Sequence, residues 1–335
     1  MAKLFAHIRL LTGVLALALL LVTVLAGSST AQQNAPNAAT SEQQLLNQFK
    51  TIQGLGTIPD KKSYVIEHPA GREWQTFHTA TLKWIGGIAI IGVLVVLVLF
   101  YLWRGKIPLT KGRSGRTIVR FGAFERFVHW LTASAFVVLA ITGLNVTFGR
   151  AIFAAGDGSE TFSTWSQWAK YAHNFISFAF TLGVVLMFIM WVGRNFPRAV
   201  DIEWLKRGGG MFSKKQDAHT HAYKFNAGQK LLFWAVVIAG AAMMISGYLL
   251  MFPFYGGMTI SNMETAEVFH GIIGVLFIAM ILGHIYIGTV GMEGAFEGMY
   301  DGAVDANWAK EHHDLWYEQV MSEGTERSTR TAPAE

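Results

Sequence analysis

The chain alternates long apolar runs with shorter polar segments. Five of these runs are long enough, at about twenty residues, to cross a bilayer as helices. They are expected to span residues 82–103, 126–148, 169–193, 229–252 and 266–290. This pattern predicts an all-α integral membrane protein, with a four-helix transmembrane bundle and one extra N-terminal transmembrane helix.

A further apolar run, Leu10–Ala26, lies close to the N-terminus. It follows Lys3 and Arg9 and is followed by a stretch of small residues. Basic residues, an apolar stretch and a small-residue cleavage site are the three parts of a secretory signal peptide. We therefore expect residues 1–31 to be a signal peptide, with an uncleaved helix as the alternative, and residues 32–78 to form an exported arm.

The composition agrees with a membrane location and excludes several kinds of site. Hydrophobic residues make up 52% of the 335 residues, and charged residues only 15%. The net charge is +5, and basic residues of membrane proteins gather in the loops that stay inside the cell. We therefore interpret the positive charge as a feature of these loops and not as a nucleic-acid binding site. The chain has no cysteine, so disulfides, cysteine-bound iron–sulfur clusters and covalently attached haem are excluded.

The distribution of basic residues predicts the orientation of the spans. The connections at 104–126 and 194–230 are rich in lysine and arginine, whereas 149–168 holds one arginine and 253–265 has no basic residue. Positive loops are retained inside, so both basic connections and the C-terminus are expected in the cytoplasm, and the N-terminal arm in the periplasm. The expected location is the bacterial inner membrane, with membrane lipid against the basic loops.

Two histidines lie inside the last apolar run, residues 268–290, fourteen positions apart. In a helix this spacing returns His270 and His284 to nearly the same face, with a rise of about 21 Å, so each lies near a different membrane surface. By the same topology, His173 lies at the outer depth of the third span and His129 at the inner depth of the second. Depth alone therefore pairs His173 with His270 and His129 with His284.

Two facing imidazoles at one depth are typical of a six-coordinate haem iron, which favours electron transfer. Without cysteine the haem is expected to be non-covalent, so two haem b groups are predicted, stacked across the membrane. Taken singly, each histidine has the alternative of a hydrogen-bonded packing residue. Small residues near these positions are explained either by close approach of a porphyrin or by helix packing. They are Gly271, Gly274, Gly283 and Gly288.

A polar segment, Lys224–Lys230, leads into the fourth span at its cytoplasmic end. Asn226 and Gln229 in this segment are candidates for hydrogen bonding to a quinone beside the inner haem, where protons arrive from the cytoplasm. The alternative is an ordinary helix N-cap at Asn226 with Gln229 on the surface.

Five other histidines are expected to lie at surfaces. His78 borders the first span without a partner at its depth and is interpreted as an interfacial residue. Four more histidines fall in cytoplasmic segments, where solvation is the expected state: His219, His221, His312 and His313.

Several motifs together resemble the gamma subunit of respiratory formate dehydrogenase, a di-haem cytochrome b. The resemblance extends over about residues 115–320. It is specific because six separate motifs match together. The motifs are Arg120–Thr132 around His129, Thr142–Asn145, Lys224–Lys230, Phe269–Gly271, Gly283–Tyr286 and Trp308–Tyr317.

The resemblance implies a four-helix haem-binding domain and a set of partners. Its haem ligands at matching positions are His129, His173, His270 and His284. An iron–sulfur beta subunit, fed by a molybdenum or tungsten alpha subunit, is implied as the electron donor, and quinone on the cytoplasmic side as the acceptor. The chain is then a subunit of a formate:quinone oxidoreductase with no catalytic residue of its own, because formate is oxidised on another chain.

The expected organisation has five parts, and two other functions stay open. The parts are residues 1–31 (signal peptide), 32–78 (periplasmic arm), 79–104 (extra transmembrane helix), 115–293 (di-haem domain) and 294–335 (cytoplasmic tail). One alternative is a cytochrome b subunit of a nickel–iron hydrogenase or of another molybdenum oxidoreductase. The second, of a different class, is a non-redox membrane transporter or anchor.

Overall fold

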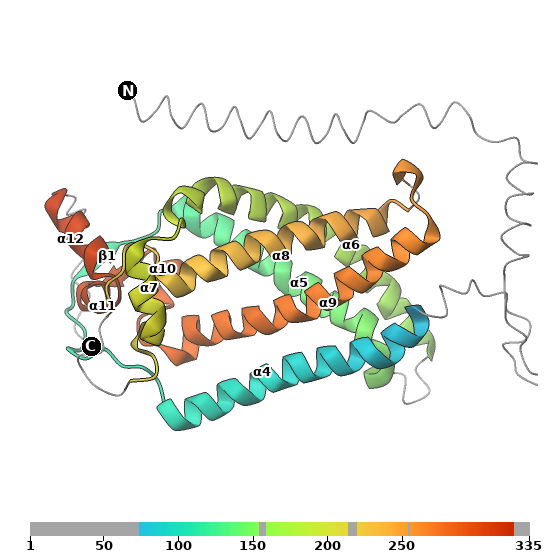
Figure 1. Cartoon of the computed structure of the whole chain (residues 1–335), viewed down its shortest axis with the longest axis horizontal. Coiled ribbons are helices and arrows are strands. Elements are labelled where there is room, and N and C mark those ends of the chain that lie inside the picture. Colours follow the sequence, from blue (N-terminus) through green and yellow to red (C-terminus); the bar gives the residue numbers. More distant parts are fainter. Residues whose placement is uncertain (1–73, 154–158, 214–219, 254, 325–335) are drawn as a thin grey trace, which may run out of the picture. The chain divides into compact units, whose positions relative to one another are not determined.

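The computed structural model describes residues 74–153, 159–213, 220–253 and 255–324 (Figure 1). The expected signal peptide, nearly all of the expected arm and His219 lie outside the described residues. The chain divides into two compact units, and one of them, His78–Met251 with Ala266–Glu335, contains every residue discussed below as part of the site. Of the other unit, the structure describes residues 74–77, 252–253 and 255–265, which include the turn Tyr255–Gly257 and the first residues of one long helix.

Five helices are long and apolar enough to cross a membrane, which confirms the predicted all-α integral membrane fold. They are α4 (Lys83–Arg104), α5 (Ala123–Phe153), α6 (Ser159–Trp191), α8 (Ala227–Met251) and α9 (Ile260–Tyr286). The helix α5 continues beyond both ends of the span predicted at 126–148, and α6 begins ten residues before the span predicted at 169–193. Hydropathy identifies the part of a helix that lies in the membrane, whereas the helix itself ends at a capping residue, a glycine or a proline. The end of the apolar run and the end of the helix therefore differ.

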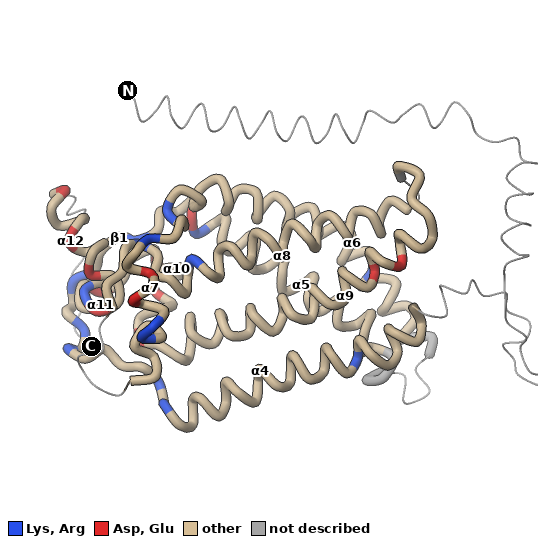
Figure 2. Tube along the Cα trace, viewed as in Figure 1, with Lys and Arg blue, Asp and Glu red and all other residues tan. Residues whose placement is uncertain are grey.

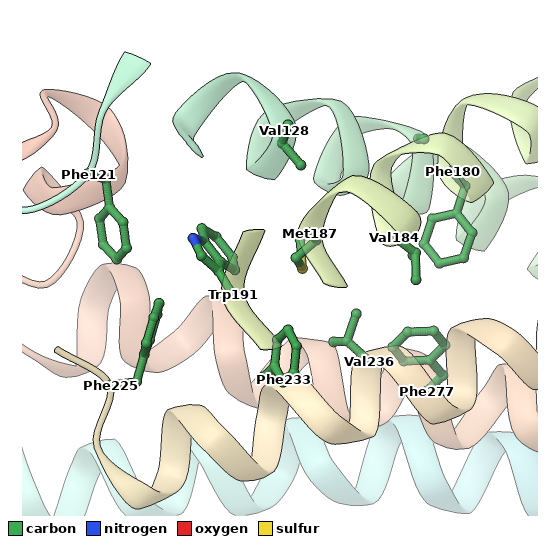
Figure 3. Close-up of a cluster of buried hydrophobic side chains, with 11 residues drawn as sticks. Phe121, Val128, Phe180, Val184, Met187, Trp191, Phe225, Phe233, Val236 and Phe277 are labelled. Atoms are coloured by element: carbon green, nitrogen blue, oxygen red, sulfur yellow. The ribbon is translucent and has the colours of Figure 1, made fainter. Parts of the chain in front are cut away.

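The core of the bundle is a line of aromatic and branched side chains between α5, α6, α8 and α9 (Figure 3). Val128, Phe180, Val184, Phe233 and Phe277 are each less than one tenth exposed. The outward faces of the same helices carry exposed apolar side chains, as expected where lipid replaces water. Close backbone packing is strongest between α5 and α6 and continues from α6 to α8, whereas α9 stands farther from its neighbours.

Short elements gather at one end of the bundle, which we call the basic end because most lysines and arginines cluster there (Figure 2). A small antiparallel ribbon pairs Thr117 with Asp305 and Val119 with Ala303. Two strands and short helices make up this end: β1 (Thr117–Val119), α7 (Ala199–Lys206), α10 (Glu297–Tyr300), β2 (Ala303–Asp305), α11 (Ala306–His312) and α12 (Asp314–Ser322).

The C-terminal segment forms a folded cap on the basic end. Its own core contains Leu109, Ile118, Val304, Trp308 and Trp316, so residues before the second span pack with residues after the last one. The helix α11 starts with an ordinary N-cap, because the side chain of Asp305 accepts a hydrogen bond from the backbone N–H two residues later.

Candidate functional site

The four histidines singled out by depth meet in two pairs. The rings of His129 on α5 and His284 on α9 have centroids 6.2 Å apart, at an interplanar angle of 67°. The rings of His173 on α6 and His270 on α9 have the same separation and angle. We call His129 and His284 the basic-end pair, and His173 and His270 the far-end pair. Along α9 the pairs are separated by fourteen residues, or about 21 Å.

The separation within each pair matches two imidazoles that share one metal ion. Each metal–nitrogen bond is about 2.0 Å and each ring nitrogen lies about 1.1 Å from its ring centre, so shared coordination places the centres about 6.2 Å apart. Both observed separations have this value. Edge-to-face aromatic pairs have centres about 4.5 to 7 Å apart, and Trp130 and Phe296 lie 6.2 Å apart at 72°. The separation is therefore compatible with shared coordination, and the burial of four imidazoles in apolar helices is the stronger indication of a ligand role.

Each histidine of the far-end pair is held by a hydroxyl. Thr142 Oγ1 lies 2.8 Å from Nδ1 of His173, and Ser246 Oγ lies 2.9 Å from Nδ1 of His270. Both hydroxyls already donate to the backbone carbonyl four residues earlier, at 2.7 Å, so they accept from Nδ1–H. This arrangement selects the tautomer in which Nε2 keeps its lone pair, which is the form that binds metal.

The basic-end pair is arranged differently. Among the described residues, Nδ1 of His129 is buried and has no hydrogen-bond partner. Burying an unpaired imidazole nitrogen is unfavourable, and unpaired polar atoms of this kind are concentrated at functional sites. Four imidazoles inside apolar helices are therefore explained better as ligands of a bound group than as packing residues.

Two glycines allow the helix backbone to lie close to the imidazoles, and neither is among the glycines singled out from the sequence. A Cβ atom at Gly247 would lie 3.1 Å from His270 Cε1, and one at Gly143 would lie 3.5 Å from His173 Cε1. Gly271 and Gly274, by contrast, face Leu82 and Met243, as expected for helix packing. A Cβ at Gly283 or Gly288 would have no described atom within 4 Å.

Three phenylalanines fill the space midway between the two pairs. Phe277 is seven residues from both histidines of α9, and Phe136 and Phe180 are each seven residues after the histidine of their own helix. The ring centroids of Phe136 and Phe277 are 4.9 Å apart, and those of Phe180 and Phe277 are 6.4 Å apart. Seven residues are nearly two helical turns, so these rings continue the faces that carry the histidines.

Asn226 and Gln229 form a reciprocal cap at the start of α8. The backbone N–H of Gln229 donates to Asn226 Oδ1 at 2.9 Å, and the backbone N–H of Asn226 donates to Gln229 Oε1 at 3.1 Å. Gln229 Oε1 also accepts from Arg120. The side-chain oxygens thus have a structural role, as in a capping box, while the amide nitrogens take no part in it.

A charged cluster one turn before His129 was not anticipated from the sequence. Glu125 Oε1 accepts from Lys224 Nζ and from Trp191 Nε1, both at 2.9 Å. The cluster ties α5 and α6 to the segment before α8. Burial lowers the pKa of Lys224, and the ion pair with Glu125 opposes that effect. The only sequence signal was the acidic residue in an otherwise basic connection.

The prediction that His313 is a solvated surface residue is wrong. Its side chain is 1% exposed, its Nδ1–H donates to Tyr223 O at 2.6 Å, and its Nε2 accepts from Arg120 at 2.9 Å. Burial lowers the pKa of Arg120 to about 9, so the guanidinium stays charged at neutral pH. His221, in contrast, is largely exposed as expected, and it pairs with Asp314.

The comparisons with known proteins agree with this architecture. A family model described as prokaryotic cytochrome b561 matches residues 120–302, more than half of the chain. The chain belongs to the prokaryotic cytochrome b561 family. It is therefore a multi-pass membrane cytochrome whose cofactor is haem b, and the match covers all four paired histidines.

Three curated relatives resemble the chain over most of their own length. The cytochrome b556(fdo) subunit of formate dehydrogenase from Escherichia coli K12 is 30% identical over 205 residues, covering 61% of this chain and 93% of that protein. The nitrate-inducible cytochrome b556(Fdn) subunit of the same organism is 27% identical, covering 62% and 93%. The cytochrome b556 subunit from Haemophilus influenzae is 26% identical, covering 61% and 84%. The resemblance to formate dehydrogenase cytochrome b subunits is confirmed.

The residues of this cytochrome b561 chain fit haem b. The pairs have the separation of shared coordination, and the far-end rings leave Nε2 free. In the basic-end pair, a buried nitrogen of His129 lacks any described partner. Methionine and tyrosine are other haem ligands available without cysteine, but the paired imidazoles would offer two nitrogen ligands at each depth.

Proposed function

We propose that this chain is the membrane cytochrome b subunit of a respiratory formate dehydrogenase complex, passing electrons from a periplasmic iron–sulfur subunit to quinone on the cytoplasmic side. The proposal rests on the two histidine pairs, together with relatives that are formate dehydrogenase cytochrome subunits. Formate is oxidised in this proposal on a molybdenum or tungsten subunit, and the present chain has no catalytic role in that step.

Two haem b groups are proposed, with His173 and His270 as axial ligands of the outer one and His129 and His284 as ligands of the inner one. When bound, the haems supply one-electron redox centres at two depths of the bundle. The chain's own residues hold those centres apart along α9 and keep water away with apolar packing. The basic end, rich in lysine and arginine, is proposed to face the cytoplasm, which places the far-end pair toward the periplasm (Figure 2).

The quinone site is proposed to lie beside the basic-end pair. Asn226 and Gln229 are the candidate hydrogen-bonding residues, through amide nitrogens that their reciprocal cap leaves unused. The inner-membrane location and the periplasmic N-terminal arm, residues 32–78, belong to the same proposal. The division into a di-haem domain, residues 115–293, and a cytoplasmic tail, residues 294–335, also remains a proposal.

The deciding experiment purifies the membrane complex and counts haem per chain by pyridine haemochrome absorbance. Two b-type haems are expected in the unsubstituted protein, and one in His270→Ala and in His284→Ala, with different haems lost. A maximum of one haem in the unsubstituted protein contradicts the two-haem proposal. Co-purification identifies the complex: formate-oxidising and iron–sulfur subunits are expected, whereas a nickel–iron large subunit indicates a hydrogenase.

A further inference from the structure

The two histidine pairs differ in what touches their rings. In the far-end pair both imidazoles donate Nδ1–H to a hydroxyl, of Thr142 or Ser246, and His173 also interacts with the backbone carbonyl of Leu139. In the basic-end pair, by contrast, Nδ1 of His129 is buried and has no hydrogen-bond partner within the described part of the chain. The pairs have the same separation and ring angle, so hydrogen bonding is a clear difference between them.

The two hydroxyls are well placed to act as acceptors. Thr142 sits on α5 while the ring it holds, His173, sits on α6; Ser246 sits on α8 while His270 sits on α9. Each hydroxyl proton is committed to a backbone carbonyl of its own helix, and that bond polarises the oxygen and strengthens it as an acceptor. Each contact therefore fixes the orientation of an imidazole on a neighbouring helix.

A hydrogen bond donated by Nδ1–H shifts electron density toward Nε2. The ring becomes a more basic ligand, and a more basic ligand stabilises the ferric state of an iron that it binds. The reduction potential of that iron falls as a result. With both ligands hydrogen-bonded in this way, the effect occurs twice at the far-end site.

We propose that Thr142 and Ser246 are positioning residues that fix the tautomer of the far-end pair and lower the potential of its haem below that of the basic-end haem. This inference rests on the proposed function. A lower potential at the far end makes electron transfer toward the basic end favourable, which agrees with donors on one side of the membrane and quinone on the other.

The test is a spectroelectrochemical titration of the full-length protein, purified with its haem. We expect Thr142→Val and Ser246→Ala each to raise the potential of one haem component and to leave the second unchanged. The expected shift is roughly threefold to tenfold in the reduced-to-oxidised ratio at fixed ambient potential, or about 28 to 59 mV for one electron. The component that moves is the one missing from His270→Ala.

Matched variants separate electronic tuning from general disturbance of the bundle. Thr142→Ser and Ser246→Thr retain a hydroxyl and are expected to keep the original potential. Thr147 lies on the same helix as Thr142, and among the described residues its hydroxyl bonds to the carbonyl of Gly143. Thr147→Val is expected to change neither potential. If Thr142→Val does not assemble with haem, Ser246→Ala decides the question alone.

The failure of this inference is distinct from the failure of the proposed function. Two haems with unshifted potentials in Thr142→Val and Ser246→Ala overturn the inference and leave the proposed function intact. Equal shifts of both components also overturn it. A protein with fewer than two haems overturns the two-haem proposal on which the inference depends.

Discussion

Phe136 on α5 and Phe277 on α9 meet edge to face, with ring centroids 4.9 Å apart at an interplanar angle of 60°. This contact lies midway between the two histidine pairs, and Phe277 is 4% exposed. The packing of these rings therefore sets the distance between the helices that carry opposite members of the basic-end pair. Loss of the contact is expected to loosen the basic-end pair.

Phe277→Ala is expected to lower the free energy of unfolding by about 3 kcal/mol, because it removes a buried ring and leaves a cavity. Thermal unfolding followed by haem absorbance measures the effect. Phe277→Leu preserves most of the volume and is expected to cost less than about 1.5 kcal/mol. The control is Leu276→Ala, because Leu276 is 52% exposed on the same helix. Equal losses at Phe277 and Leu276 would contradict the prediction.

Glu125→Gln is expected to destabilise the protein by about 2 to 4 kcal/mol, because it leaves Lys224 partly buried without its counter-charge. The two side chains are only 21% and 13% exposed. Glu203→Gln is the control, since its ion pair with Arg207 is about half exposed and is worth about 0.5 kcal/mol. The double variant Glu125→Gln with Lys224→Met should be more stable than the sum of the single variants predicts. Additive losses would show that the two charges are not coupled.

Acidification is expected to destabilise the cap at the basic end through His313. Burial lowers the pKa of His313 well below its ordinary value of 6.5, with a further contribution from the charge of Arg120. The unfolded chain then binds a proton that the folded chain does not, so the stabilisation is complete above pH 6.5 and falls at lower pH by about 1.4 kcal/mol per unit. His313→Gln should remove this acid dependence in thermal unfolding measured between pH 5 and 8.

His221 provides a contrast of opposite sign in the same cap. Its hydrogen bond to Asp314 and the carboxylate charge raise its pKa, so its contribution is complete below pH 6.5 and is lost as the pH rises through the raised value. His221→Gln should therefore leave the acid-side loss in place, or steepen it. An unchanged acid dependence in His313→Gln would be evidence against a buried neutral imidazole at that position.

Asn226→Asp separates the capping role of this residue from its proposed role at quinone. Aspartate caps a helix as well as asparagine does, so the melting temperature is expected to change little. The substitution removes the amide donor, and quinone reduction by the complex is expected to slow by about tenfold if a hydrogen bond worth about 1.4 kcal/mol is lost in the transition state. If both quinone reduction and stability are unchanged in Asn226→Asp, Asn226 has only its role as the N-cap of α8. Asn226→Ala should impair stability as well, by about 1 kcal/mol.

The sequence by itself determined the number of spans and the pairing of histidines by depth. Both follow from local rules: hydropathy along the chain marks the spans, and a rise of about 1.5 Å per residue converts positions in a helix into depth. His270 and His284 lie on one helix, so their separation was available without any knowledge of tertiary contacts. The outward extension of α5 and α6 was missed because hydropathy reports depth and not the end of a helix.

Tertiary structure alone decided which side chains surround those histidines and which charges are buried. Thr142 reaches His173 across 31 residues of sequence, Glu125 reaches Lys224 across 99, and His313 reaches Arg120 across 193. No periodicity or motif spacing specifies such contacts, because they depend on how helices rotate and pack against one another. Hydropathy and helical rise therefore predict the depth of each imidazole from the sequence. Packing between distant segments determines the hydrogen bonds of these imidazoles and the burial of His313.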